Sequence, residues 1–452
     1  MDKQVTIIGA GIIGISTAYY LAKNHKLSNI VLIDRKNPMS LTSAASGENY
    51  RNWWPQPEMF TFINRSIDLM EEIARTTKNR INMTRRGYAL ATRHKNIDEF
   101  INELKAGMKG LDERLLRHQT KQNSNSYLKS ITNNWETTPN GVDVIQNRQL
   151  IRTAFPNYAD DVETVIHIRR GGDIDSQQLG QIMIEHLREV GVEFEFGDVL
   201  SIQKSNRYEV EYKSGNHVQK VHSDILVNAA GPYAKDVANM LGVELELLNI
   251  YQQKIAFEDN QCVIPRDLPF SIDLDPQVLD WSSDERELLS EDEEASWLLD
   301  CMPNATHCRP DGGITGNWVK LGWAYNQTPD FSYKTQKTDA SFPEVVLRGA
   351  SRLQPSLKAY YGKLPSRRVH YGGWYNMTNE NWPLIGPMQI EGAFMNCALS
   401  GFGTMASCAA GELCANWIAA ATLPSYADSF SLKRYDNPGL MERLQSASKG
   451  VL

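Results

Sequence analysis

The sequence predicts an α/β protein with two domains, and three observations support this class. The chain has 452 residues, of which 41% are hydrophobic, whereas a single hydrophobic core stops growing at roughly 250–300 residues. Residues 5–8 form a short apolar run suited to a buried parallel strand, and a helical pattern follows directly and reaches Ala22. Further along, residues 173–196 again combine a helical pattern with a strand pattern.

The turn between the first strand and the first helix carries the spacing Gly9-x-Gly11-x-x-Gly14. The first glycine permits a tight turn, the second lets the backbone approach a pyrophosphate at the positive end of the helix, and the third allows close packing of helix on strand. A second strand, residues 30–33, ends in Asp34, about 20 residues beyond Gly14. An acid at this point binds a ribose hydroxyl and repels a 2′-phosphate. The pattern predicts an adenine dinucleotide site, disfavours NADP, and leaves NAD and FAD open.

The net charge of −7 comes from one segment, residues 280–294, which holds eight acidic residues and one basic residue. Because the rest of the chain is near neutral and has no run of Lys or Arg, we expect neither a nucleic-acid nor a membrane partner. Two capping boxes, Ser282-x-x-Glu285 and Ser290-x-x-Glu293, predict two short helices in the acidic segment. A solvated face and a lid over a pocket are both possible roles for it.

The cysteines and the N-terminal region favour a reduced, cytoplasmic environment. The six cysteines have no CxxC spacing, and none precedes residue 262, which argues against a disulfide framework or a zinc ribbon. The first apolar run begins at residue 5, and no run of about 18 apolar residues occurs anywhere. The nine histidines form no ligand cluster, so we expect no metal site.

Two later segments suggest close contacts between backbone and ligand. Residues 224–232, "DILVNAAGP", predict a buried strand that ends in small residues. Residues 398–419, "ALSGFGTMASCAAGELCANWIA", predict a glycine-rich turn that leads into a helix starting at Thr404 or Met405. The N–H groups after Gly401 and Gly403 then point along a positive helix end, where they would stabilise negative charge.

Taken in order, the first glycine turn and the segments "SAASGENYR", "GGDIDSQQL", "ILVNAAGP", "VKLGW", "MTNENWPLIGP" and "SGFGTM" resemble the D-amino-acid oxidase superfamily of FAD-dependent amine oxidoreductases. The resemblance is to its glycine oxidase and sarcosine oxidase branch, and it favours FAD over NAD. It implies a Rossmann-type FAD-binding domain of discontinuous segments and a substrate domain with a mainly antiparallel sheet. We expect residues 1–85, 150–235 and 350–452 in the first domain, and residues 86–149 and 236–349 in the second.

The resemblance also implies a set of cofactor-binding residues. They are Gly9, Gly11, Ile12, Ile13, Gly14, Asp34, Arg35, Ser43, Ala45, Ser46, Gly47, Val199, Ala229, Ala230, Gly231, Gly401, Phe402, Gly403, Thr404 and Met405. Sarcosine oxidases attach FAD to a cysteine, and the matching position here is Gly373. We therefore predict non-covalent FAD.

For the reaction, the resemblance implies hydride transfer to FAD from the carbon beside an amine nitrogen, giving an imine that water hydrolyses. Lys320 in "NWVKLGWAYN" matches the lysine that activates O2 in sarcosine oxidase, which implies reoxidation by O2 and release of H2O2. A solvated strand lysine is the alternative. Arg51 and Arg309 are candidates for binding a substrate carboxylate. Arg51 is otherwise a partner of FAD phosphate or of Glu48, and Arg309 a partner in a structural ion pair.

Aromatic residues complete the predicted substrate site. Trp374 and Tyr375 lie in a segment that the resemblance places near the flavin, and a large aromatic lining suggests a substrate bulkier than glycine. His307 and His370 are the histidines in candidate site segments, although hydride transfer from a neutral amine does not strictly need a base. Two other functions stay open: a dehydrogenase that passes electrons to a quinone or an electron-transfer protein, and a flavin-bearing assembly protein without turnover. The sequence does not indicate the oligomeric state.

Overall fold

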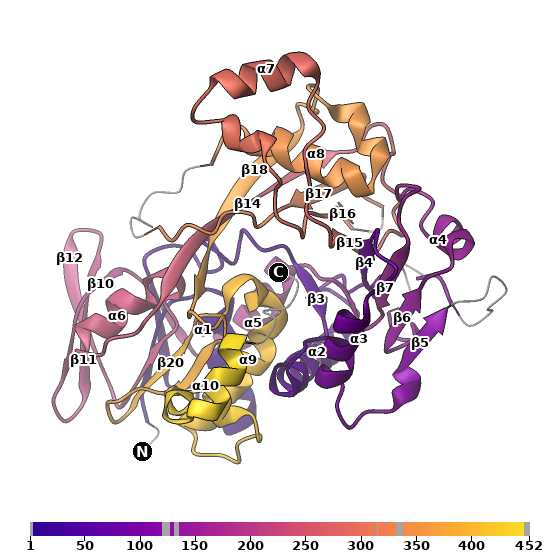
Figure 1. The fold of residues 1–452 in the computed structure, drawn as a ribbon. Coiled ribbons are helices and arrows are strands. Elements are labelled where there is room, and N and C mark those ends of the chain that lie inside the picture. Colours follow the sequence, from indigo (N-terminus) through magenta and orange to yellow (C-terminus); the bar gives the residue numbers. More distant parts are fainter. Residues whose placement is uncertain (1–2, 120–126, 131–134, 314, 331–337, 447–452) are drawn as a thin grey trace.

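The computed structural model describes residues 3–119, 127–130, 135–313, 315–330 and 338–446. Figure 1 shows two main layers, a six-stranded sheet covered by α1, α5 and α9, and a nine-stranded sheet above it that carries α8 and α7 on its far side. A three-stranded sheet (β10, β11 and β12) and a two-stranded sheet (β3 and β8) complete the strands of the described chain. This arrangement confirms the predicted α/β class with a Rossmann-type domain and a second, mainly antiparallel domain.

The six-stranded sheet has the order β19-β20-β13-β1-β2-β9. Its central strand β1 pairs in parallel with β2 and with β13, so that Val5 lies opposite Ile30 and Ile225. Its strands are β1 (Val5–Ile8), β2 (Ile30–Asp34), β9 (Glu193–Phe196), β13 (Ile225–Asn228), β19 (Leu384–Pro387) and β20 (Ala393–Cys397). The helices of this half are α1 (Ile12–His25), α2 (Pro57–Thr76), α5 (Ser176–Glu189), α6 (Ala234–Met240), α9 (Gly403–Ile418) and α10 (Pro438–Ser446).

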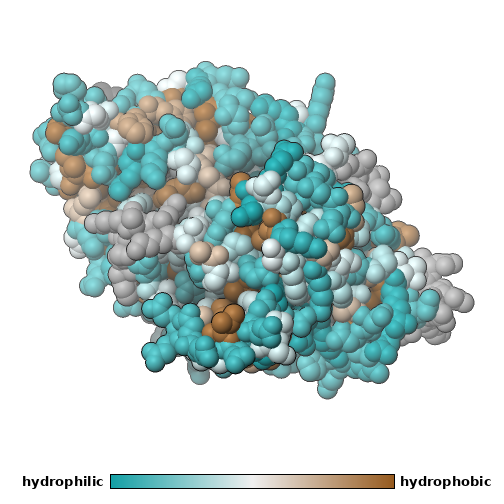
Figure 2. Space-filling view, turned by 90° about the horizontal axis from the view of Figure 1, so that it is seen from above, coloured by the Kyte–Doolittle hydropathy of each residue, from teal (hydrophilic) through white to brown (hydrophobic). Residues whose placement is uncertain are grey.

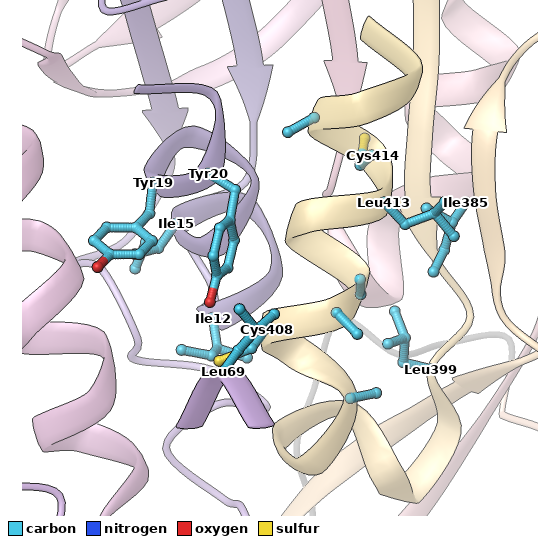
Figure 3. Packing of buried hydrophobic residues seen from close by; sticks show 14 of the residues in the cluster. Ile12, Ile15, Tyr19, Tyr20, Leu69, Ile385, Leu399, Cys408, Leu413 and Cys414 are labelled. Carbon is cyan, nitrogen blue, oxygen red and sulfur yellow. The ribbon is translucent and has the colours of Figure 1, made fainter. Parts of the chain in front are cut away.

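Helices α1 and α9, which lie near opposite ends of the sequence, pack against each other over the six-stranded sheet. Figure 3 shows Tyr20 of α1 pointing toward Cys408 of α9, while Leu413 faces Ile385. Small residues allow the close approach, since a Cβ on Gly411 would lie 2.5 Å from the carbonyl carbon of Ser16. This packing holds the two helix N-termini over one edge of the sheet.

The nine-stranded sheet has the order β18-β14-β17-β16-β15-β4-β7-β6-β5 and is antiparallel except for the pairs β15–β4 and β5–β6. Its strands are β4 (Tyr88–Thr92), β5 (Leu116–Gln119), β6 (Val142–Ile145), β7 (Thr164–Ile168), β14 (Leu248–Glu258), β15 (Phe270–Asp273), β16 (His307–Asp311), β17 (Trp318–Gly322) and β18 (Arg368–Met377). Helices α3 (Asp98–Gly107), α4 (Arg148–Ala154), α7 (Ser283–Glu291) and α8 (Phe342–Leu353) belong to this half. The smaller sheets comprise β3 (Asn49–Arg51), β8 (Gly171–Asp173), β10 (Asp198–Lys204), β11 (Tyr208–Ser214) and β12 (His217–Ser223).

Sheet membership divides the chain differently from the expected domain boundaries. Both β7 and β18 belong to the nine-stranded sheet, although they fall in segments that we expect in the FAD-binding domain. Strand β18 pairs with β14 along its whole length, from Leu248 opposite Met377 to Phe257 opposite Arg368. Such pairing joins segments that are far apart in the sequence, and no local pattern reports it.

The acidic segment contains one α-helix where two helices were expected. Helix α7 begins after Ser282 with the predicted capping box to Glu285. The second predicted box is wrong: the Ser290 hydroxyl donates to the carbonyl oxygen of Glu287, and the next element is a short 3-10 helix, Ser296–Leu299. An ion pair of 2.6 Å between Glu285 and Arg348 fixes α7 on α8. Figure 2, seen from the α7 side, shows a mainly hydrophilic face with scattered hydrophobic residues.

Candidate active site

A cavity of about 1490 Å3, its open mouth included, lies at the carboxyl ends of β1, β2 and β13, where ligands bind in open α/β sheets. It extends from there to β14 and β18 of the nine-stranded sheet and to the start of α9. Its lining includes Ile8, Gly9, Gly11, Ile12, Ile13, Asp34, Arg35, Lys36, Thr42, Ser43, Ala45, Ser46, Gly47, Val199, Ala229, Ala230, Gly231, Tyr233, Lys254, Gly373, Trp374, Tyr375, Asn376, Cys397, Gly401, Gly403 and Thr404.

The first glycine turn has the geometry that the spacing predicts. Gly9 adopts φ +107°, and a Cβ on it would lie 2.3 Å from the carbonyl oxygen of Ala229. A Cβ on Gly14 would lie 1.9 Å from the carbonyl oxygen of Gly9, so this residue allows α1 to pack against the turn. The N–H of Ile12 in the first turn of α1 donates to the Ser43 hydroxyl at 3.0 Å. Gly9, Gly11 and Ile12 line the cavity at this point, where a pyrophosphate would bind.

Asp34 at the end of β2 lines the cavity at the end near the first glycine turn. Its Oδ2 accepts the Ala10 N–H at 2.7 Å, and its Oδ1 accepts the Lys36 N–H at 2.9 Å. Burial raises the pKa of this carboxyl group, against the effect of the two N–H donors. Next to it, Arg35 pairs with Asp198 at 3.0 Å, and its guanidinium carbon lies 4.0 Å from the centre of the Tyr233 ring.

The C-terminal glycine turn lies at the other end of the cavity. There it meets the loop between β2 and β3, which we call the first loop. Helix α9 begins at Gly403, and the residue before it, Phe402, has no side-chain group that could cap the free N–H groups. The Ser46 and Thr404 hydroxyls are hydrogen-bonded at 2.7 Å. A Cβ on Gly401 would lie 2.6 Å from the Tyr375 ring, which shows how closely this ring covers the turn.

One face of the nine-stranded sheet is turned toward the cavity. Because residues directly opposite each other in an antiparallel pair share a face, the register places Lys254 of β14 on the same face as Tyr371 of β18. By the alternation along β18, Gly373 and Tyr375 belong to this face too. The opposite face carries Ile255, Phe257, Val319 and Leu321, which pack with α8 in a separate core. Helices α8 and α7 therefore lie on the side of the sheet away from the cavity, which does not fit a lid.

A buried ion cluster stands beside the cavity, on the same sheet face. The Lys320 ammonium lies 2.8 Å from Oε2 of Glu48, and the Arg309 guanidinium lies 3.1 Å from the same atom. Arg309 also contacts Asp311 at 2.7 Å. Burial alone would raise the pKa of Asp311, but the nearby charges of Arg309 and Lys320 lower it to about 2. Burial and the charge of Arg309 lower the pKa of Lys320, but Tyr371, Asp311 and Glu48 outweigh them, so that the pKa is raised.

The structure brings some of the predicted catalytic residues to the cavity and not others. Trp374 and Tyr375 line it, whereas Lys320, Arg309 and Arg51 do not. The Arg51 guanidinium carbon lies 4.9 Å from the Trp54 ring centre and 5.3 Å from that of Tyr88, and burial lowers the pKa of Arg51.

Most of the predicted cofactor residues line the cavity. Gly14, Phe402 and Met405 do not; the side chains of Phe402 and Met405 are buried in the core of α1 and α9. The sequence prediction missed Thr42, Tyr233, Asn376 and above all Lys254, which all line it. One sequence feature could have identified Lys254. It is a lysine in the middle of the strand segment "IYQQKIAF", which has apolar residues toward both ends.

The two candidate histidines are not charged acid–base groups in this arrangement. Burial, with the nearby charge of Lys254, lowers the pKa of His307 to about 3, so its ring is neutral at physiological pH. His370 lies 2.9 Å from the Gln253 side-chain oxygen, and burial lowers its pKa too. Within the described chain, no group of three or more His, Cys, Asp or Glu residues could hold a metal ion. No helix in the same residues is long and apolar enough to cross a membrane.

The fold and the cavity define a protein of the dinucleotide-binding class. The family model described as FAD dependent oxidoreductase (DAO) matches residues 4–417, so the chain belongs to this family, and FAD is its cofactor. This confirms the resemblance drawn from the sequence. The glycine turns, Asp34 and the start of α9 fit FAD along the length of the cavity.

Known proteins with similar sequence or fold include oxidases and a dehydrogenase. L-saccharopine oxidase of Schizosaccharomyces pombe is 25% identical over 250 residues, which are 53% of this chain and 53% of that protein; the match thus spans about half of this curated relative. L-proline dehydrogenase from P. horikoshii has a TM-score of 0.70 and 16% identity, covering 96% of this chain and 98% of that one. Iminodiacetate oxidase from Chelativorans sp. BNC1 has a TM-score of 0.70 and 18% identity, with coverage of 95% and 98%. The two solved structures share the fold.

We predict that FAD is released intact when the protein is denatured. Gly373 offers no thiol at the sarcosine oxidase attachment position, and a Cβ there would already lie 3.0 Å from the Ala45 Cβ. Cys397 does line the cavity, but burial raises the pKa of its thiol to about 12, which keeps it protonated and a poor nucleophile. Acid precipitation should leave the flavin fluorescence in the supernatant, for wild type and Cys397→Ser alike. A yellow pellet from the wild type would contradict the prediction.

Proposed function

We propose that this protein oxidises the C–N bond of an amino acid or an N-alkyl amino acid. The observation that carries the proposal is one continuous cavity, with Asp34 and the first glycine turn at one end and Lys254, Gly373 and Tyr375 at the other. When bound, FAD supplies the acceptor for a hydride from the carbon beside the amine nitrogen. The hydrolysis of the resulting imine by water completes the reaction.

The chain's own residues have distinct tasks in this proposal. The turn at Gly9 and Gly11 binds the pyrophosphate, and Asp34 binds the ribose. The first N–H groups of α9 stabilise negative charge at the end of the cavity near Tyr375. Trp374, only 2% exposed, packs its ring on Tyr251 with centroids 4.9 Å apart, and so supports the strand that carries Tyr375.

The similar proteins support secondary amines as part of the substrate class. Saccharopine, iminodiacetate and proline, after which these three proteins are named, are all secondary amines that carry carboxylates. The proposal therefore includes N-substituted as well as primary amino acids.

The deciding experiment is a screen of amino acids and N-alkylated amino acids with the flavin-loaded protein under anaerobic conditions. We expect bleaching of the flavin absorbance by at least one of them. If no amine bleaches the flavin, the proposal is lost, and a flavin-bearing assembly protein without turnover takes its place.

We further propose O2 as the electron acceptor, with H2O2 as the product. The match of Lys320 to the sarcosine oxidase lysine supports an oxidase, and the likeness to a proline dehydrogenase is the specific reason to keep a dehydrogenase as the second candidate. Stopped-flow mixing of the reduced protein with O2 separates the two. Reoxidation no faster than that of free flavin would favour the dehydrogenase.

Lys320→Met is expected to slow reoxidation by O2 at least about tenfold, that is by about 1.4 kcal/mol of activation free energy, and to leave anaerobic flavin reduction largely intact. A fixed cation near a developing anion lowers the barrier to O2 reduction, whereas hydride transfer from the amine does not need this charge. Lys358→Met is the matched control, because Lys358 is 52% exposed and pairs with Asp280. Equal losses in both half-reactions would instead indicate a structural or binding role.

A further inference from the structure

Lys254 is a buried lysine whose side chain ends in the cavity. It stands in the middle of β14, is only 5% exposed and belongs to the cavity lining. Its Cε lies 3.5 Å from the position of a Cβ on Gly47, and its Nζ lies 5.4 Å from the centre of the Tyr375 ring. These contacts place the ammonium between the first loop and β18, at the end of the cavity away from Asp34.

No acidic side chain of the described residues pairs with Lys254. Its Nζ has no carboxylate within 4.0 Å among the described residues, although the neighbouring cations do. In the ion cluster, Arg86, Arg309 and Lys320 face Asp173, Asp311 and Glu48, three positive charges against three negative ones. A buried ammonium without a partner is costly. An anion from a ligand would offset that cost.

The other basic residues near the cavity lie at its opposite end or are engaged in ion pairs. Arg35 and Lys36 line the Asp34 end, and Arg35 pairs with Asp198. Arg309, a predicted carboxylate binder, donates to the Gly47 carbonyl oxygen at 3.0 Å as well as to Glu48. Lys254 is thus the basic residue that reaches the cavity at the β14–β18 end in the described chain.

We infer that the Lys254 ammonium binds the carboxylate of the substrate and so orients the amine-bearing carbon; this rests on the proposed amino-acid oxidation. Substrates with an α-carboxylate are then preferred over simple amines. His307, opposite Gly322 on the adjacent strands, adds no second charge because its ring is neutral. A single ammonium and a single carboxylate match in charge.

The test measures ligand binding to the flavin-loaded protein, through changes in the flavin absorbance spectrum. The probes are benzoate and acetate, each compared with the uncharged benzamide and acetamide. Lys254→Met should raise the Kd of the carboxylates at least about tenfold, as expected for the loss of a charge-assisted hydrogen bond, and should change the Kd of the amides less than about threefold. Lys254→Arg should restore most of the carboxylate affinity because it keeps the charge.

Three results would overturn the inference. The first is an unchanged carboxylate affinity in Lys254→Met, and the second is an equal loss for carboxylates and amides, which would indicate an altered cavity shape. The third is a loss of FAD affinity with no loss of carboxylate affinity in the protein that stays loaded, which would assign the lysine to the cofactor. The anaerobic screen tests the proposed function separately, since a wild type that binds carboxylates through Lys254 but is bleached by no amine would refute only the oxidation.

Discussion

Gly14→Ala is expected to abolish stable FAD binding and to lower the free energy of unfolding by about 3 kcal/mol or more. The new Cβ would lie 1.9 Å from the carbonyl oxygen of Gly9. This contact is with the backbone, so no side-chain rotation relieves it. Helix α1 would have to move away from β1, and the turn at Gly9 and Gly11 would no longer present its N–H groups to the pyrophosphate.

Gly439→Ala is the matched control for this change. Gly439 lies in α10, and the nearest atom to its added Cβ is Oδ1 of Asn437 at 3.8 Å. Because alanine favours a helix over glycine by up to about 1 kcal/mol, this variant should be as stable as the wild type or slightly more so. The measurements are the ratio of FAD to protein after desalting and the thermal unfolding midpoint with and without added FAD. A fully loaded Gly14→Ala protein would refute the expectation.

The parts of the cavity lining that the sequence predicted depend on short stretches of chain. The run from β1 through the glycine turn to α1 and β2 needs only local patterns, because each glycine is required by atoms within the same unit or by the next parallel strand. The same holds for the turn before α9, where the helix starts at Gly403, one residue before the earlier of the two expected starts, Thr404 and Met405.

The parts that it missed depend on strand pairing between distant segments. Strand β18 pairs with β14 across more than 100 residues of chain, and this pairing brings Lys254 next to Tyr375. The sequence motif singled out Lys320 as the lysine that activates O2, which stays a prediction, but it did not indicate that the ammonium lies 2.8 Å from Glu48. Such a contact depends on how the first loop packs against the nine-stranded sheet.

The failed capping box has a similar explanation. The pattern Ser290-x-x-Glu293 is compatible with a helix start, but residue 290 still lies inside α7, which ends at Glu291. A serine within a helix donates to a preceding carbonyl group instead, as Ser290 does to Glu287. The motif alone does not indicate whether the serine starts a new helix or lies inside the preceding one.

Glu48→Gln is expected to cost about 3 kcal/mol of the free energy of unfolding. Its Oε2 contacts Lys320 at 2.8 Å and Arg309 at 3.1 Å, and its Oε1 accepts the Ser176 hydroxyl at 3.2 Å. The neutral amide would no longer balance the two buried cations, which would keep Asp311 as a nearby acidic residue. One N–H group of the amide would also point toward another hydrogen-bond donor. Removing one member of a buried ion pair leaves an uncompensated charge, which is why the expected loss is large.

The surface variant Glu185→Gln is the matched control, since Glu185 and its partner Arg80 are 40% and 43% exposed. Exposed ion pairs contribute about 0–1 kcal/mol, so the control should stay close to the wild type.

The double variant Glu48→Gln/Lys320→Met tests the cause of the loss. It removes one acid and one base together, so the balance of the cluster is restored, and the methionine keeps most of the buried lysine stem. We expect it to recover at least about 1 kcal/mol relative to the sum of the two single changes, the size of coupling found for groups in one network. Strict additivity would mean that Glu48 stabilises the loop through Ser176 and the backbone and not through the two cations. Glu48 follows Gly47, which lines the cavity. Non-additive losses would therefore mean that the shape of the FAD site depends on the charge balance of the ion cluster on the nine-stranded sheet.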